Sequence, residues 1–191
     1  MISGDDDGIV VVEMKRIDVA TYFRGPETLR PMELIHGAVR EPPAPRYGHQ
    51  SLVTHLGALM HQHVRELDIG QVCVSPVDVV LDEAAALVLQ PDIIFISKER
   101  LSIIRERVFG PPDLVVEVLS AGTAHRDRTT KLGWYHRYGV KECWLVDRRS
   151  RSLELVDLGG RRPQHYTYVG NAIPQSSVLP SWNVPAEHAF S

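Results

Sequence analysis

The chain lacks the features that mark secreted, membrane and metal-knuckle proteins. Only two of its 191 residues are cysteines, Cys73 and Cys143, which are too few and too far apart for a disulfide framework. No apolar run approaches the ~18 residues that a membrane span needs. The N-terminal segment MISGDDDG is acidic where a signal peptide would be basic. We therefore expect a cytoplasmic protein with no membrane segment, in which both cysteines are buried and reduced.

The chain also lacks a basic excess and a glycine-rich phosphate loop. Its 21 Lys and Arg against 24 Asp and Glu give a net charge of -3, which argues against a protein that coats nucleic acid. Residues 98–151 are nevertheless basic, with 12 Lys and Arg against 7 Asp and Glu. Such a region can contact phosphates, and we predict nucleic-acid contacts at Arg126 and Arg128. A solvated charged face is the alternative reading.

Length and composition predict one domain. With 43% apolar residues, the chain is long enough to bury one good core. We expect a tail over residues 1–15, with an unassigned apolar run at 9–12, and a single domain over 16–191. The periodicity predicts helices at 17–23, 48–67, 98–107 and around Lys131. It predicts strands at 32–39 (two, with a turn at His36-Gly37), 71–74, 77–81, 88–96, 114–119, 143–146, 153–156 and near 165–168.

The order of these elements predicts an α/β fold, a mixed β-sheet flanked by helices. The three runs between 71 and 96 suggest a meander. A strand, helix, strand crossover links Glu117 to Val146, so those two strands should be parallel.

Two buried runs each contain one carboxylate. Glu117 lies in the apolar run 114–119 and Asp92 in the run 87–96, where an unpaired charge would cost several kcal/mol, of the order of 3 or more. Asp127, Lys131 and Tyr135 follow at i, i+4 and i+8, on one face of a helix. Two carboxylates and a lysine are therefore predicted to converge.

These residue types suit phosphoryl chemistry. Two carboxylates on adjacent strands can hold Mg²⁺ or Mn²⁺, with water, a backbone carbonyl and substrate phosphate completing the octahedron. A nearby lysine can orient a water or stabilise negative charge in the transition state. The alternative is a buried Glu117–Lys131 ion pair that braces a helix against a sheet, with Asp92 merely ending a strand.

Several motifs together resemble a known family. They are the segments LQPDIIFI from Leu89, PDLVVEVLS from Pro112, DRTTKLGWY from Asp127, YGV from Tyr138 and WLVD from Trp144. In this order they resemble the Uma-type restriction endonucleases, once a domain of unknown function, in the PD-(D/E)XK nuclease superfamily. The resemblance runs from about Ile17 to the C-terminus. It implies a restriction-endonuclease-like core and metal-dependent cleavage of phosphodiester bonds in DNA.

The resemblance also implies a set of site residues. Pro91-Asp92 matches the PD dipeptide, and Glu117-Val118-Leu119 takes the place of (D/E)XK. Leu119 occupies the position of the motif lysine, so Lys131 is the expected substitute. The implied catalytic residues are Asp92, Glu117 and Lys131, and the implied metal ligands are Asp92, Glu117 and the backbone carbonyl of Val118.

Three further residues are expected to support the site. Tyr135 can orient Lys131 or Glu117, His49 begins the first long helix and can point at the site, and Glu33 lies on a motif strand. Asp127 is expected to cap the Lys131 helix. Cleavage of duplex DNA would favour two sites and hence a homodimer. The alternative function is a non-catalytic nucleic-acid-binding or regulatory protein on the same fold.

Overall fold

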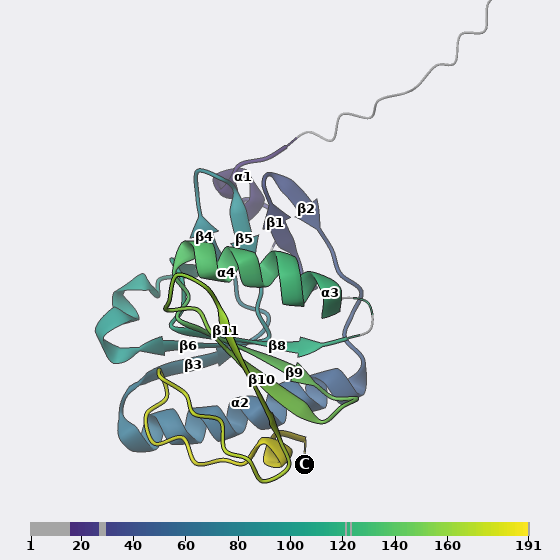
Figure 1. Cartoon of the computed structure of the whole chain (residues 1–191). Helices are drawn as coiled ribbons and strands as arrows, with labels where there is room; N and C mark the ends of the chain where they lie inside the picture. The colour runs from purple at the N-terminus through teal and green to yellow at the C-terminus, as the bar shows by residue number, and fades with distance from the viewer. Residues whose placement is uncertain (1–15, 27–29, 121, 123, 191) are drawn as a thin grey trace, which may run out of the picture.

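The computed structural model describes residues 16–26, 30–120, 122 and 124–190 (Figure 1). The predicted tail and the apolar run at 9–12 lie outside these residues. The first elements are α1 (Val19–Phe23), β1 (Glu33–Ile35), β2 (Ala38–Arg40), α2 (Tyr47–Leu67) and β3 (Gly70–Val74). The predicted short helix, the hairpin that turns at His36-Gly37 and the first long helix are all confirmed.

The middle of the chain differs more from the prediction. It forms β4 (Val79–Asp82), β5 (Leu87–Leu89), β6 (Ile93–Ser97), the 3-10 helix η1 (Lys98–Ile103), β7 (Val108–Phe109) and β8 (Leu114–Leu119). The single strand predicted at 88–96 is wrong, because the chain leaves the ladder at Gln90-Pro91-Asp92, where proline has no N–H to donate. The predicted meander is also wrong: β3 pairs with β6, and β4 pairs with β5.

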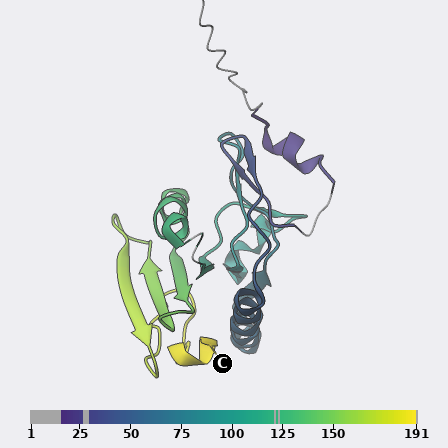
Figure 2. The ribbon, with the colours of Figure 1, turned by 90° about the vertical axis from the view of Figure 1, so that its right-hand side faces the viewer.

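The described residues form two mixed sheets. The larger has the order β11-β10-β9-β8-β6-β3, where β9 is Glu142–Asp147, β10 is Ser152–Asp157 and β11 is Gln164–Val169. The smaller has the order β2-β1-β5-β4-β7. The β8–β9 pair is parallel, as the crossover predicts, and β11 forms an edge. Figure 2 shows β9, β10 and β11 on one side, with the β1–β2 hairpin and α1 on the other.

Strand β8 lies between two layers of packing, and all six of its residues are buried. The helix α2 covers one face of the larger sheet and α4 (Leu132–Tyr138) covers the other (Figure 1). Leu114, Val116 and Val118 pack in the core cluster that contains α2 residues. Val115 and Leu119 pack in the cluster that contains α4 residues. Because side chains alternate along a strand, Glu117 faces α4.

The helical segment between β8 and β9 contains one irregular turn. It consists of α3 (Ala124–Arg126), the π-helical turn η2 (Asp127–Lys131) and α4, and it ends at Gly139, whose φ of 91° suits glycine. The predicted capping role of Asp127 is wrong, because the helix begins three residues earlier and Asp127 is buried inside it. π-turns within helices are frequent at functional sites.

The C-terminal segment wraps the larger sheet and ends in the 3-10 helix η3 (Ala186–Phe190). Glu142 of β9, fully buried, anchors it: Oε1 accepts hydrogen bonds from Trp144 Nε1 (2.7 Å) and Ser176 Oγ (2.6 Å). Oε2 accepts from the backbone N–H (2.9 Å) and hydroxyl (3.1 Å) of Ser177.

The prediction that both cysteines are buried holds for one of them. Cys143 is buried, but Cys73 is exposed because β3 is an edge strand, so its predicted burial is wrong. Among the described residues, no helix combines the length and apolar character that crossing a membrane requires.

Replacing Glu142 should detach the C-terminal wrap. Glu142→Ala leaves four donors unpaired, so we expect the free energy of unfolding to fall by about 3 kcal/mol in urea titrations. The exposed Glu66→Ala on α2 is the control and should change it by less than about 0.5 kcal/mol. Equal effects of the two substitutions would contradict the anchoring role.

Candidate active site

The two predicted carboxylates lie on neighbouring segments of the larger sheet: Glu117 belongs to β8, and Asp92 directly precedes β6. In the antiparallel β6–β8 ladder, Ile93 pairs with Val116 and Ile94 with Val115. Asp92 lies just outside this ladder, and its Oδ2 accepts the backbone N–H of Val118, the residue after Glu117, at 2.7 Å. The prediction that these two strands are neighbours is confirmed.

Glu117 accepts two hydrogen bonds from the α4 side through the same oxygen. Its Oε1 lies 2.9 Å from Lys131 Nζ and also accepts the Tyr135 hydroxyl. No donor among the described residues contacts Oε2. Burial raises the pKa of Glu117 to about 8 against the lowering effect of the Lys131 charge, and the charges of Asp127 and Asp92 add to the rise. Oε1 is therefore the oxygen of Glu117 that the protein holds by hydrogen bonds.

Lys131 is the hub of the buried charges. Its Nζ lies 2.9 Å from Glu117 Oε1, 3.1 Å from Glu33 Oε1 and 3.7 Å from Asp127 Oδ1. Burial alone would lower the pKa of Lys131, but the three carboxylates raise it. The lysine is thus a permanent cation, and the predicted contact between Glu117 and Lys131 is present in the structure.

Glu33 is a central member of this charge network, because both of its carboxylate oxygens contact cations. Its Oε2 lies 2.7 Å from Arg126 Nη2 and 3.4 Å from Arg40 Nη1. Burial would raise the pKa of Glu33, but Lys131 and Arg126 lower it below its usual range. Glu33 therefore stays charged and ties the β1–β2 hairpin to the segment 124–131.

Asp92 connects the site to α2. Its Oδ2 accepts the backbone N–H of Val118 at 2.7 Å and lies 3.3 Å from His49 Nε2. Burial would lower the pKa of His49, but the hydrogen bond and charge of Asp92 raise it. No described residue contacts Oδ1 of Asp92. His49 thus points at the site, as its position at the start of the helix suggested.

A divalent cation fits the residues present. Among the charged side chains described above, the carboxylates are Glu33, Asp92, Glu117 and Asp127, and the permanent cations are Arg40, Arg126 and Lys131. Asp92 Oδ1 and Glu117 Oε2 take part in no hydrogen bond or ion pair with the described residues, which leaves these two oxygens for a cation. Within the described ranges, no three His, Cys, Asp or Glu side chains form a preformed metal cluster. One or two carboxylates, with waters and substrate oxygens, are the usual ligand set of Mg²⁺.

The two arginines predicted to contact nucleic acid are both engaged within the protein. Arg126 pairs with Glu33, and its guanidinium lies 5.8 Å from the centroid of the Trp134 ring. Arg128 pairs with Glu154 of β10. The sequence does not predict that Glu33 and Glu117 both contact Lys131, because residues far apart in the chain give no periodic signal. The i, i+4 spacing of Asp127 and Lys131 did indicate their contact.

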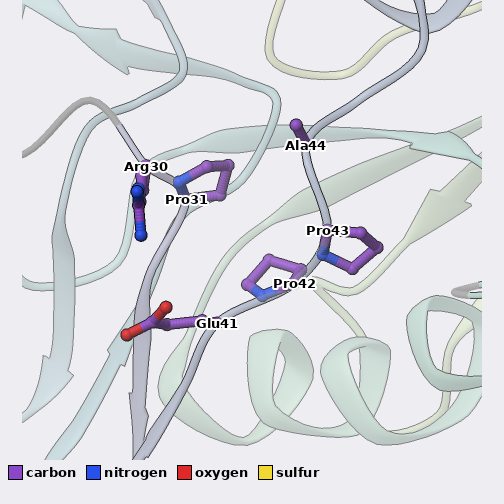
Figure 3. Close-up of a pocket in the computed structure, with 6 residues that line it drawn as sticks. All are labelled: Arg30, Pro31, Glu41, Pro42, Pro43 and Ala44. Atoms are coloured by element: carbon purple, nitrogen blue, oxygen red, sulfur yellow. The ribbon is translucent and has the colours of Figure 1, made fainter.

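Two surface hollows lie away from the carboxylates. One of about 440 Å³ lies at the open end of the β1–β2 hairpin and is lined by Arg30, Pro31, Glu41, Pro42, Pro43 and Ala44 (Figure 3). The other, of about 570 Å³, is lined by Gly160, Arg161, Arg162 and Gln164. Neither includes Asp92, Glu117 or Lys131, so the chemistry is assigned to the carboxylates and not to these hollows.

Comparisons with known proteins identify the family and the fold. A family profile described as "Uma2: Putative restriction endonuclease" matches residues 19–187. A crystal structure of "a putative nuclease belonging to DUF820" from Anabaena variabilis ATCC 29413 is similar, with a TM-score of 0.76 and 16% identity. The similarity covers 91% of this chain and 97% of that chain. No curated protein matches. The predicted family resemblance and α/β fold class are confirmed.

The raised pKa of Glu117 makes stability depend on pH. A carboxyl whose pKa is higher in the folded state stabilises the fold below its ordinary pKa, and this contribution is lost as pH rises toward about 8. In EDTA, Glu117→Gln should therefore gain stability relative to the wild type between pH 5 and pH 8, by about 1 kcal/mol or more in urea titrations. A stability difference that is the same at both pH values would contradict this.

Proposed function

Because the chain belongs to the Uma2 family, described as "Putative restriction endonuclease", we propose that it is a metal-dependent endonuclease that hydrolyses phosphodiester bonds in DNA. The observation that best supports this is that β6 and β8 are neighbours, with Asp92 Oδ2 accepting the Val118 N–H at 2.7 Å and Lys131 Nζ 2.9 Å from Glu117 Oε1. Family membership and fold support a nuclease; the metal and the DNA substrate are the further parts of the proposal.

The proposed ligands of Mg²⁺ or Mn²⁺ are Asp92, Glu117 and the backbone carbonyl of Val118. A bound cation of this kind would acidify a water and neutralise charge at the scissile phosphate. The protein holds both carboxylates in place: the Val118 N–H fixes Oδ2 of Asp92, and Tyr135 and Lys131 fix Oε1 of Glu117. One oxygen of each carboxylate thereby remains available.

Lys131 is proposed to take the role of the motif lysine that Leu119 replaces. Its raised pKa keeps the ammonium protonated, so it acts as a charge and a hydrogen-bond donor and does not accept a proton. Glu33 and Asp127 hold it on the α4 side of Glu117. From there it can orient the attacking water or stabilise negative charge at phosphorus.

His49 is proposed as a positioning residue. Its Nε2 lies 3.3 Å from Oδ2 of Asp92, the oxygen that already accepts the Val118 N–H. This contact favours one orientation of the carboxylate and leaves Oδ1 directed away from α2. Cleavage of both strands of a duplex would need two such sites, and we propose a homodimer on that basis.

A second candidate function is a non-catalytic nucleic-acid-binding or regulatory protein. The buried Lys131 contacts with Glu117, Glu33 and Asp127 favour it, because such a network can serve only to brace the segment 124–138 against the sheet. Only the nuclease function includes cleavage, and it requires Asp92 and Lys131 for that step.

Neutralising Asp92 should abolish cleavage without unfolding the protein. Asp92→Asn keeps an acceptor for the Val118 N–H but removes the charge, so plasmid nicking with Mn²⁺ should fall by about 100-fold or more, and Mn²⁺ affinity in calorimetry should fall too. Asp68→Asn, at a side chain that is 82% exposed, is the control and should cut normally. A folded Asp92→Asn protein with wild-type nicking would exclude the proposed metal site.

Removing Lys131 should separate the two functions. Lys131→Ala leaves three carboxylates without this cation, so we expect the free energy of unfolding to fall by about 3 kcal/mol or more. Below its melting temperature, the folded variant should still bind Mn²⁺ but lose nicking. Lys141→Ala is the matched control, since Lys141 Nζ lies 2.8 Å from buried Asp113 but outside the carboxylate site. A folded Lys131→Ala protein that nicks as fast as Lys141→Ala would favour the brace alone.

A further inference from the structure

A basic turn lies against the start of α2, beside the His49–Asp92 contact. The guanidinium of Arg148, in the turn between β9 and β10, packs on the α-carbon of Gly48. A Cβ at Gly48 would lie 2.2 Å from Nη1, 2.4 Å from Cζ and 2.8 Å from Nη2 of Arg148. Only glycine permits this approach, and the next residue is His49, whose Nε2 lies 3.3 Å from Asp92 Oδ2. Arg148 is therefore held next to the candidate active site.

The same turn lies along the first half of α2. Arg151 lies over the ring of Phe190 in η3, with its Cζ 5.4 Å from the ring centroid. The helix η3 contacts α2 through His55 Nε2, which lies 2.8 Å from the backbone oxygen of His188. The arginines at both ends of the turn are thus located by contacts with α2 or with η3.

The arginines of this region differ from those predicted to bind nucleic acid. Arg46, Arg148, Arg149 and Arg151 are exposed, and no carboxylate of the described residues pairs with any of them. The neighbouring Asp147 contacts the backbone of the turn and not a guanidinium: its Oδ1 accepts the backbone N–H of Arg149 at 2.8 Å. Four guanidinium groups are therefore available to an anionic partner.

Tyr47 lies at the start of α2, between Arg46 and the Gly48 against which Arg148 packs. It is 88% exposed, whereas the other exposed large apolar side chains range from 37% to 56%. We call Arg46, Tyr47, Arg148, Arg149 and Arg151 the Tyr47 surface. Proteins that bind single-stranded nucleic acid combine such a ring, on which a base can stack, with basic groups that contact the backbone. A paired duplex offers phosphates to the arginines but no free base face to the ring.

We propose that the Tyr47 surface binds an unpaired stretch of the substrate strand, with a base stacked on Tyr47 and a neighbouring phosphate on Arg148. The substrate class is then nucleic acid with a single-stranded segment beside the scissile bond. This inference rests on the proposed function, but it uses none of the carboxylates.

Binding without cleavage tests the role of the ring. In EDTA, fluorescence anisotropy would measure the affinity for a labelled single-stranded oligodeoxynucleotide of about 15 nucleotides and for a blunt duplex of the same length. Tyr47→Ala should weaken single-strand binding by about ten-fold and duplex binding by less than about two-fold. Tyr47→Phe keeps the ring and should bind as the wild type does. Unchanged single-strand affinity of Tyr47→Ala, or an equal loss for both ligands, would overturn the proposal.

A second pair of variants tests the phosphate contact. Arg148→Ala should lower the slope of log affinity against log salt by about 0.7, the value for one phosphate on a single strand. Gly48→Ala should weaken binding in the same direction, because its methyl group displaces the guanidinium. Gly133→Ala is the control, since a Cβ there meets nothing within 4 Å. An Arg148→Ala protein with the wild-type salt slope would overturn the assignment of Arg148.

The two proposals can fail separately. If Tyr47→Ala loses single-strand binding as expected but the wild type nicks nothing with Mn²⁺, the nuclease function is wrong and the binding surface stands. If Asp92→Asn abolishes nicking while Tyr47→Ala binds and cuts normally, the binding surface is wrong and the nuclease function stands.

Discussion

The ammonium group of Lys131, surrounded by Glu117, Glu33 and Asp127, is the interaction on which the rest of the site depends. Three buried carboxylates without it would repel one another at low dielectric. With it, three segments distant in the chain, β1, β8 and the turn η2, are fixed to one another. The same network engages only one carboxylate oxygen of Glu117, Oε1.

The site therefore has two unlike flanks. On the α4 side, Lys131, Glu33 and Arg126 form a closed charge network in which every member has a partner. On the α2 side, His49 contacts Asp92, and the arginines beyond it have no carboxylate partner among the described residues. The closed flank positions the carboxylates, and the open flank faces solvent, where a polyanion can approach.

How much the sequence predicts depends on whether a feature is local. The apolar run around Glu117 and the i, i+4 spacing of Asp127 and Lys131 predict a buried strand, a helix face and their convergence. The long apolar run from 87 to 96 predicts a single strand. It therefore hides the break at Pro91, which sends β5 and β6 into different sheets. The π-turn that buries Asp127, and the partners of Arg126 and Arg128, depend on tertiary contacts with Glu33 and Glu154 that have no sequence period.

The central claim is that Asp92 and Glu117 together form one divalent-metal site. A crystal of the protein soaked in Mn²⁺ and measured near the manganese absorption edge tests it directly. The account predicts one anomalous peak with oxygen atoms of Asp92 and Glu117 about 2.0–2.3 Å away. An absence of any peak there, with manganese bound elsewhere or not at all, would contradict it.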